Sequence, residues 1–257
     1  MPNSRKGVRL PLSAARKMVV EWLHHAKKIP SLPLKRAMNV GALLAAREAA
    51  PQRPSWVALF LKAYAIVARD RPELRRTYIP FPWPHLYEHP ISECSVLVER
   101  DWDGEKAVLA AKIRGPEEQP LPAIDGFMKR FATAPAQSVS DLRQLTRLGK
   151  LPGFARRWAF WNTLNLSGFT KSKRFGTFMV SSLGNFGVEQ MHPLTPLTTY
   201  LSFGPITANG DVTALIVYDH RVVDGRTVAG ALVDLEAALN GPVLAEVRAM
   251  TTLQVAA

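Results

Sequence analysis

The segment YDHRVVDG, residues 218–225, holds a histidine in a setting where it could act as a base. An apolar run of strand type leads into it, so a strand would deliver His220 to a turn, with Asp224 four residues later where the next helix begins. A neutral imidazole can take a proton from a thiol or hydroxyl group that attacks a carbonyl carbon. Asp224 would orient the histidine or brace the turn. On spacing alone, a catalytic histidine and a buried histidine that forms its hydrogen bonds with the backbone are equally favoured.

A second segment, FMVSSLGNFG, places two serines at the end of a strand, before glycines that allow close approach of a ligand to the backbone. Ser181 or Ser182 could donate a hydrogen bond to an oxyanion, and loss of one such donor costs on the order of 3 kcal/mol of transition-state stabilisation. A serine pair before a glycine is also typical of turns. The chain has no GxSxG motif, so neither serine is interpreted as a nucleophile.

The elements around these segments alternate in type, which predicts a mixed α/β protein formed by one domain over residues 1–257. Asp224 is the predicted N-cap of the helix that follows His220. The proline-rich residues 78–90 predict a rigid loop or an irregular edge strand, and Asp103 and Gly104 predict a turn between two strands. The expected helices cover residues 12–28, 55–68, 123–149 and 224–240, and the expected strands cover residues 32–40, 94–99, 106–113, 176–183, 198–206 and 212–220.

Charge and composition limit the partners and the compartment. The formal charge of +12 attracts anions such as acidic lipid, an acidic carrier protein or a phosphorylated cofactor. No nucleic-acid-binding motif accompanies that charge, so nucleic acid is not the expected partner. The only cysteine, Cys94, excludes an intramolecular disulfide, and His24 and His25 have no other metal ligand at suitable spacing. These features, with no signal-like apolar stretch, predict a cytoplasmic protein without a metal.

Residues 150–174 form a basic segment interrupted by aromatic residues, and residues 1–11 form a basic N-terminal arm. The segment predicts either an amphipathic helix that covers the core, or contact with an acyl chain or a membrane surface through aromatic rings such as Trp158 and Trp161. Its basic side chains would contact coenzyme A phosphates or an acidic carrier protein, or form a solvated face. These basic side chains are Arg156, Arg157, Lys171, Lys173 and Arg174.

Together, the serine-bearing segment and the histidine-bearing segment resemble one known family. YDHRVVDG resembles the HxxxDG motif of the 2-oxoacid dehydrogenase acyltransferase catalytic domain, which is related to chloramphenicol acetyltransferase, and FMVSSLGNFG resembles that family's serine-bearing strand. SAARKMVVEWLHHAKKIPSLPL resembles its opening helix and strand, and SWVALFLKAYAIVARDRPELR resembles its next long helix. The resemblance spans nearly the whole chain.

The resemblance implies a fold, a mechanism and an assembly. The implied fold is the chloramphenicol-acetyltransferase-like two-layer α/β fold, a mixed sheet with flanking helices. His220 would be the general base that deprotonates the acceptor, Ser181 would bind the oxyanion, and Asp224 would pair with Arg16 of the opening helix. The implied assembly is a homotrimer with active sites between subunits. Coenzyme A or acyl-CoA would be a substrate in direct transfer, with no metal or prosthetic group.

Departures from the family define the alternatives. The catalytic region begins almost at Met1, so no lipoyl module is expected ahead of it and no covalently attached lipoyl group is predicted. Residues 78–90, the GPEEQP turn and residues 150–174 also lack counterparts in the family. We therefore expect a stand-alone acyltransferase that uses acyl-CoA or an acyl carrier protein. The alternative is a non-catalytic trimeric scaffold, or a protein that binds membrane surfaces, built on the same fold.

Overall fold

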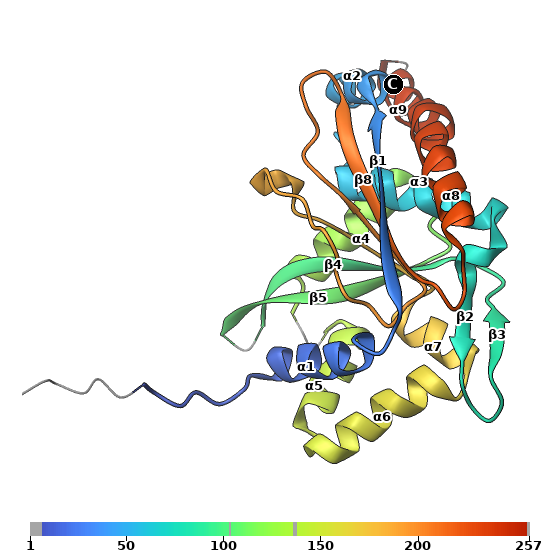
Figure 1. Cartoon of the computed structure of the whole chain (residues 1–257). Helices are drawn as coiled ribbons and strands as arrows, with labels where there is room; N and C mark the ends of the chain where they lie inside the picture. Colours follow the sequence, from blue (N-terminus) through green and yellow to red (C-terminus); the bar gives the residue numbers. More distant parts are fainter. Residues whose placement is uncertain (1–6, 103, 136–137, 256–257) are drawn as a thin grey trace, which may run out of the picture.

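A six-stranded mixed sheet forms the centre of the molecule (Figure 1). The computed structural model describes residues 7–102, 104–135 and 138–255. The strand order is β1-β8-β7-β6-β4-β5, and β6 is parallel to both of its neighbours while the other pairs are antiparallel. In that order the strands are Ser31–Asn39, Asp211–Asp219, Thr199–Phe203, Phe178–Ser182, Glu93–Trp102 and Glu105–Arg114. The predicted mixed α/β fold is confirmed, and Asp103 of the predicted turn lies outside the described residues.

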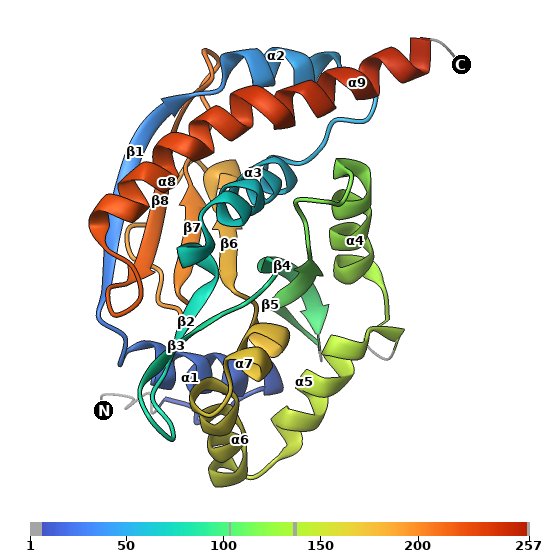
Figure 2. The same cartoon turned by 90° about the vertical axis from the view of Figure 1, so that its right-hand side faces the viewer.

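Helices cover one face of this sheet and bury the main core (Figure 2). The most buried is α3, because its residues are largely apolar and pack against the sheet. Ser55 caps its first turn by accepting a hydrogen bond from the Ala58 amide (3.1 Å). The helices of this layer are α2 (Gly41–Ala49), α3 (Trp56–Asp70), α4 (Leu121–Thr133), α8 (Gly225–Ala238) and α9 (Leu244–Val255), with a π turn at Leu239–Val243 between the last two.

The continuous helix from Gly225 to Thr251 is long and apolar enough to cross a membrane, by length and composition alone. One face of it, however, packs into the protein interior: Val228, Leu232 and Leu235 are buried in the main core. This burial makes it a core helix, as the spacing of its apolar residues predicts.

Four other helices lie at one end of the molecule, below the sheet in Figure 1. They are α1 (Ala14–Ala26), α5 (Ser140–Lys150), α6 (Gly153–Asn165) and α7 (Gly168–Phe175). The segment 123–149, predicted to be helical, forms two helices, α4 and α5: α4 ends at Thr133 because Pro135 follows, and the residue before a proline disfavours helical geometry. The basic segment 150–174 forms two helices, α6 and α7. Of the predicted N-terminal arm, residues 1–6 lie outside the described residues.

The proline-rich segment also differs from its prediction. It forms a regular antiparallel hairpin, in which β2 (Arg76–Ile79) pairs with β3 (His85–Glu88). All three prolines between them, Pro80, Pro82 and Pro84, lie in the connection, so four residues on each side keep their backbone donors and can pair.

Candidate active site

His220 stands just beyond the end of β8, next to the start of β1. Its backbone amide donates to the Pro30 carbonyl oxygen (3.1 Å), which ties the turn to the edge of the sheet. The side chain is 46% exposed. A histidine in this position is held by the fold and can still reach a substrate.

The hydrogen bond of the His220 ring fixes where its proton resides. Nδ1 lies 3.2 Å from the carbonyl oxygen of Val223. A carbonyl oxygen can only accept, so Nδ1 carries the hydrogen and Nε2 of the neutral ring keeps its lone pair. No described residue forms a hydrogen bond with Nε2. The ring is therefore in the tautomer that a general base requires.

Asp224 lies beside this ring but not in its predicted role as a cap. It occupies the N-cap position of α8, yet its side chain makes no capping hydrogen bond. Its Oδ1 lies 3.6 Å from His220 Nδ1, and the carboxylate is largely exposed. Within the described chain, the ion pair of Asp224 is with His220, and Arg16 lies exposed on α1, so the expected pairing with Arg16 stays a prediction.

A buried ion pair holds the turn that carries His220. The Asp219 carboxylate is 2% exposed and accepts from Arg221 Nε (2.9 Å) and Nη2 (2.7 Å), and from the Arg221 amide (3.0 Å). The guanidinium also stacks on the Tyr78 ring at 4.6 Å. The predicted ion pairing of the two residues that flank His220 is confirmed, and it braces the turn on the side away from the imidazole.

Ser181 and Ser182 have different surroundings. The Ser182 hydroxyl donates to the Phe203 carbonyl (2.8 Å) and accepts from the Gly184 amide (3.1 Å), so it is used within the turn after β6. The Ser181 side chain is buried and interacts with the hydroxyl group of Tyr200 on β7. Burial raises the pKa of Tyr200, so its phenol stays protonated. Of the two serines, Ser181 is the one with a hydroxyl not committed to the turn.

The sheet register places Ser181 and His220 far apart within one chain. Ser181 pairs with Ser202 on β7, and Ser202 pairs with Leu215 on β8. Asp219, next to His220, lies four residues further along β8 than Leu215. Ser181 and Asp219 are therefore separated by about 13 Å along the strands and about 10 Å across them. A base and an oxyanion donor that serve one carbonyl group must both lie within about 3 Å of the reacting atoms. One chain alone cannot supply both groups to one substrate.

Most of the predicted basic contacts are occupied inside the protein. Arg156 and Arg157 of α6 both pair with Glu21 of α1, at 3.5 Å and 3.0 Å, and the Glu21 carboxylate is 2% exposed. Lys171 is buried near Asp219, and burial lowers its pKa to about 8. The Arg157 side chain remains 48% exposed despite its ion pair, and Lys173 and Arg174 are exposed on α7. Arg156 and Lys171 are buried and Arg157 is paired with Glu21, so the expected contact with coenzyme A phosphates or an acidic carrier protein stays a prediction for Lys173 and Arg174.

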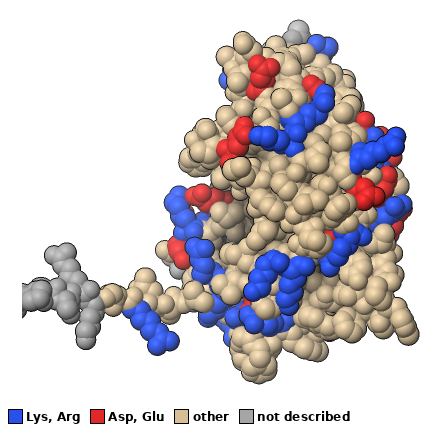
Figure 3. All heavy atoms as spheres, in the orientation of Figure 1, with Lys and Arg blue, Asp and Glu red and all other residues tan. Residues whose placement is uncertain are grey.

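The aromatic residues of α6 lie partly on the surface. Phe154 and Trp158 are 81% and 69% exposed, and Trp161 packs edge-to-face on Phe81 at 5.3 Å. Trp83, beside Phe81 in the β2–β3 connection, is 77% exposed. These five rings form a surface that we call the aromatic ridge. Figure 3 shows Lys and Arg side chains gathered over the lower half of the molecule, where α1 and α6 lie.

Tyr200 was not predicted as a site residue. Strand alternation is the signal that could have found it, because it places Met179 and Ser181 on one face of β6 and Tyr200 on the same face of β7. Register between the two strands was needed to bring them together. Among the described residues, no group of three or more potential ligands could hold a metal ion.

Comparison with known proteins identifies the fold. No family model matches the chain, and no curated protein does. The cubic core of a pyruvate dehydrogenase multienzyme complex is similar in structure (TM-score 0.66, 16% identity, 95% of this chain and 96% of that chain). So is an Azotobacter vinelandii dihydrolipoamide acetyltransferase studied for the catalytic roles of a serine, a histidine and an asparagine (0.65, 17%, 95% and 96%). A chloramphenicol acetyltransferase also matches (0.52, 13%, 89% and 96%). The chain has the fold of these acyltransferases.

Proposed function

We propose that this protein is an acyltransferase that moves an acyl group between a thioester and a thiol or hydroxyl acceptor. The observation that carries the proposal is the fixed tautomer of His220, which leaves Nε2 as a base on a turn clamped by the Asp219–Arg221 pair. A scaffold protein needs neither feature. The acyltransferase fold supports the same conclusion.

In the proposed reaction, His220 Nε2 removes the proton of the acceptor thiol or hydroxyl group. The acceptor atom then attacks the thioester carbonyl carbon, and the carbonyl oxygen becomes an oxyanion that accepts a hydrogen bond from Ser181. When the tetrahedral intermediate collapses, the carbon–sulfur bond breaks and the leaving thiolate takes the proton back from His220. The reverse direction uses the same groups.

We further propose that each active site forms between two copies of the chain, in a homotrimer. His220 and Ser181 cannot meet within one chain, so His220 of one copy would act with the serine of its neighbour. The cubic core of a dehydrogenase complex, which has this fold, is itself a multisubunit assembly.

The Azotobacter enzyme supports the choice of residues. The histidine and asparagine studied there are four positions apart in sequence, as His220 and Asp224 are here, and the serine precedes them in both chains. An asparagine in that place has no charge. Asp224 is accordingly proposed to act on the orientation of His220 and not as a base.

The proposed thioester is acyl-CoA or an acyl carrier protein, and the proposed compartment is the cytoplasm. The exposed cations Lys173 and Arg174, with the formal charge of +12, would attract either acidic partner. The mechanism requires no metal and no attached lipoyl group from this chain.

Thiol release from a panel of acyl-CoA thioesters tests the proposal. A cell extract supplies acceptors, and wild type is compared with His220→Ala. Release that needs both the extract and His220 supports acyl transfer. Release that is the same in the variant contradicts it, and absence of release from every acyl-CoA, followed by absence with acyl carrier protein thioesters, leaves the non-catalytic alternative.

A second candidate function, contact with a membrane surface, is favoured by the aromatic ridge. Phe154, Trp158 and Trp161 follow one another at helical spacing along α6, and the β2–β3 connection adds two more rings. Exposed aromatic rings beside cationic side chains are typical of proteins that lie on anionic bilayers. This contact is compatible with catalysis, because the ridge uses none of the proposed catalytic groups.

A further inference from the structure

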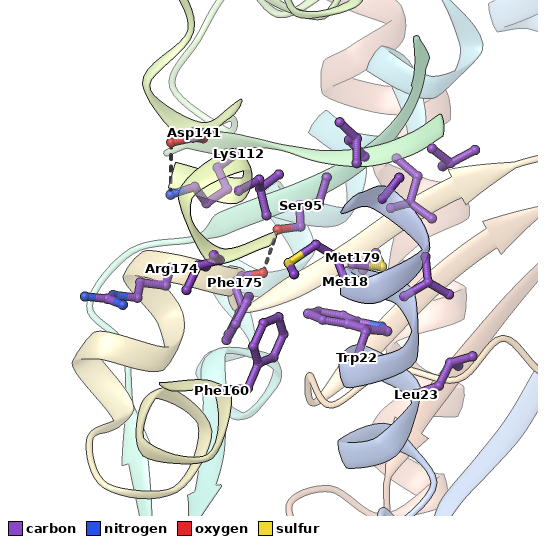
Figure 4. A pocket seen from close by; sticks show the side chains of 18 of the residues that line it. Met18, Trp22, Leu23, Ser95, Lys112, Asp141, Phe160, Arg174, Phe175 and Met179 are labelled. Atoms are coloured by element: carbon purple, nitrogen blue, oxygen red, sulfur yellow. Dashed lines mark hydrogen bonds and ion pairs between the residues drawn. The ribbon is translucent and has the colours of Figure 1, made fainter. Parts of the chain in front are cut away.

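A cavity of about 320 Å³ lies between the sheet and the four helices at its lower end (Figure 4). Met18 and Trp22 reach it from α1, Phe160 from α6, and Met179 and Tyr200 from the sheet. A cavity of this size is in the range of small-molecule sites. Its walls combine the predicted opening helix with α5 and α6, and α6 comes from the basic aromatic segment 150–174.

Several of the polar atoms around the cavity already have partners. Ser95 Oγ donates to the Phe175 carbonyl (2.6 Å), and Thr163 Oγ1 donates to the Ala159 carbonyl (2.9 Å). At the rim, Lys112 pairs with Asp141 (3.5 Å). In Figure 4, the Arg174 side chain extends away from the space between Phe160 and Trp22. Because most of the lining side chains are apolar, a polar group brought into this cavity would lose water and find few partners, so an apolar occupant fits best there.

The cavity adjoins the proposed oxyanion donor. Tyr200 contributes its ring to the cavity wall, and its hydroxyl interacts with Ser181. Met179 also lines the cavity and is two residues before Ser181 on the same face of β6. When Ser181 binds a carbonyl oxygen, a substituent of that carbonyl carbon can therefore pass along Met179 and Tyr200 into the cavity.

We propose that this cavity binds the unbranched apolar chain of a medium-length acyl group, a proposal that builds on the acyl transfer inferred above. A cavity of about 150 Å³ lined by apolar side chains binds benzene, with its six carbon atoms. The cavity here is about twice as large, and it would take roughly twelve carbon atoms by the same measure. The substrate is thus an acyl group much longer than acetyl.

Fatty-acid binding tests the cavity without catalysis. A dansyl-labelled undecanoic acid is bound to the whole protein and displaced by free fatty acids from butanoate to hexadecanoate. Affinity should rise about fourfold per methylene group, because each buried methylene contributes about 0.8 kcal/mol, and should level off near dodecanoate. Affinity that does not depend on chain length overturns the proposal.

Filling the cavity provides the matched comparison. Ala110 of β5 lines the cavity, and Ala110→Phe should weaken dodecanoate binding more than tenfold, while Ala245→Phe, on the exposed side of α9, should bind as wild type does. Val19→Phe, on the α1 wall of the cavity, serves if Ala110→Phe does not fold. Unchanged binding in a folded cavity variant overturns the proposal.

His220→Ala separates this proposal from the proposed reaction. The variant should bind dodecanoate as tightly as wild type, because His220 does not line the cavity. Chain-length-dependent binding with no transfer activity in wild type would reject the reaction and retain the apolar chain site. Transfer activity that accepts only acetyl groups would retain the reaction and reject the site.

Discussion

Ser181 and His220 lie at opposite ends of the sheet, on strands separated by β7. The proposed reaction needs both groups at one carbonyl, so two defective variants should restore each other. Mixing Ser181→Ala with His220→Ala, after dissociation and reassembly, should recover about a quarter of wild-type activity, because about one interface in four then combines an intact serine with an intact histidine. Acyl-CoA thiol release measures the recovery.

The control for this experiment is each variant taken alone through the same dissociation and reassembly, which should remain inactive. An active monomer, or no recovery from a mixture that sediments as mixed trimers, would show that the two residues do not share an interfacial site.

Loss of Arg221 should destabilise the protein, because Arg221 holds the turn that carries His220, the proposed base. Arg221→Leu leaves the Asp219 carboxylate buried without its bidentate partner, and we expect a loss of about 2 kcal/mol in the free energy of unfolding. Urea unfolding followed by tryptophan fluorescence measures it. Arg69→Leu is the matched control, because its ion pair with Asp70 is solvent-exposed and should contribute less than about 0.5 kcal/mol. Equal effects of the two substitutions would contradict the clamp.

The sequence was sufficient for the local features of the site. Apolar runs of strand type predict β6, which carries Ser181, and β8, which leads to His220, and Ser55 predicts the start of α3, because these signals depend on neighbours along the chain. The ion pairs of Arg156 and Arg157 with Glu21 were not predictable in this way, since they join residues about 135 positions apart. Without knowledge of that packing, a buried arginine looks the same as a surface cation.

The contact between Tyr200 and Ser181 illustrates the same limit. Alternation gives the face of each strand, but only the register between β6 and β7 brings these two side chains together. The apolar cavity depends on still more distant segments, since α1, α6 and β7 meet there. The residue types proposed for catalysis were therefore visible in the sequence, and the residues that line the cavity were not recognisable as a group.

Stability should fall as the pH is lowered, because of His25. This residue is buried against Phe160, and burial, reinforced by the charge of His24, lowers its pKa from 6.5 to about 4. The unfolded chain then binds a proton that the folded chain does not. The stabilising effect of a neutral His25 is complete above pH 6.5 and is lost as the pH falls toward 4, by about 3 kcal/mol.

His25→Phe isolates this contribution, because Phe cannot be protonated and His25 Nε2 has no hydrogen-bond partner to lose. The difference in unfolding free energy between variant and wild type should grow in favour of the variant between pH 6.5 and pH 4. A difference that is constant over this range would show that His25 is not kept neutral by the fold.

The aromatic ridge should bind anionic bilayers. Replacing Phe154 and Trp158 together by serine removes two of its exposed rings, and co-sedimentation with vesicles of phosphatidylglycerol and phosphatidylcholine should fall at least tenfold. Phe186→Ser is the control, because that ring is 77% exposed on the turn after β6 and does not belong to the ridge. Binding of wild type should also weaken with added salt, since the basic side chains contribute to it.

The ridge has a different role if wild type does not sediment with anionic vesicles at low salt, or if the control substitution reduces binding as much as the double substitution does. In either case, acyl transfer by His220 and Ser181 would be unaffected, because the ridge shares no residue with the proposed catalytic groups.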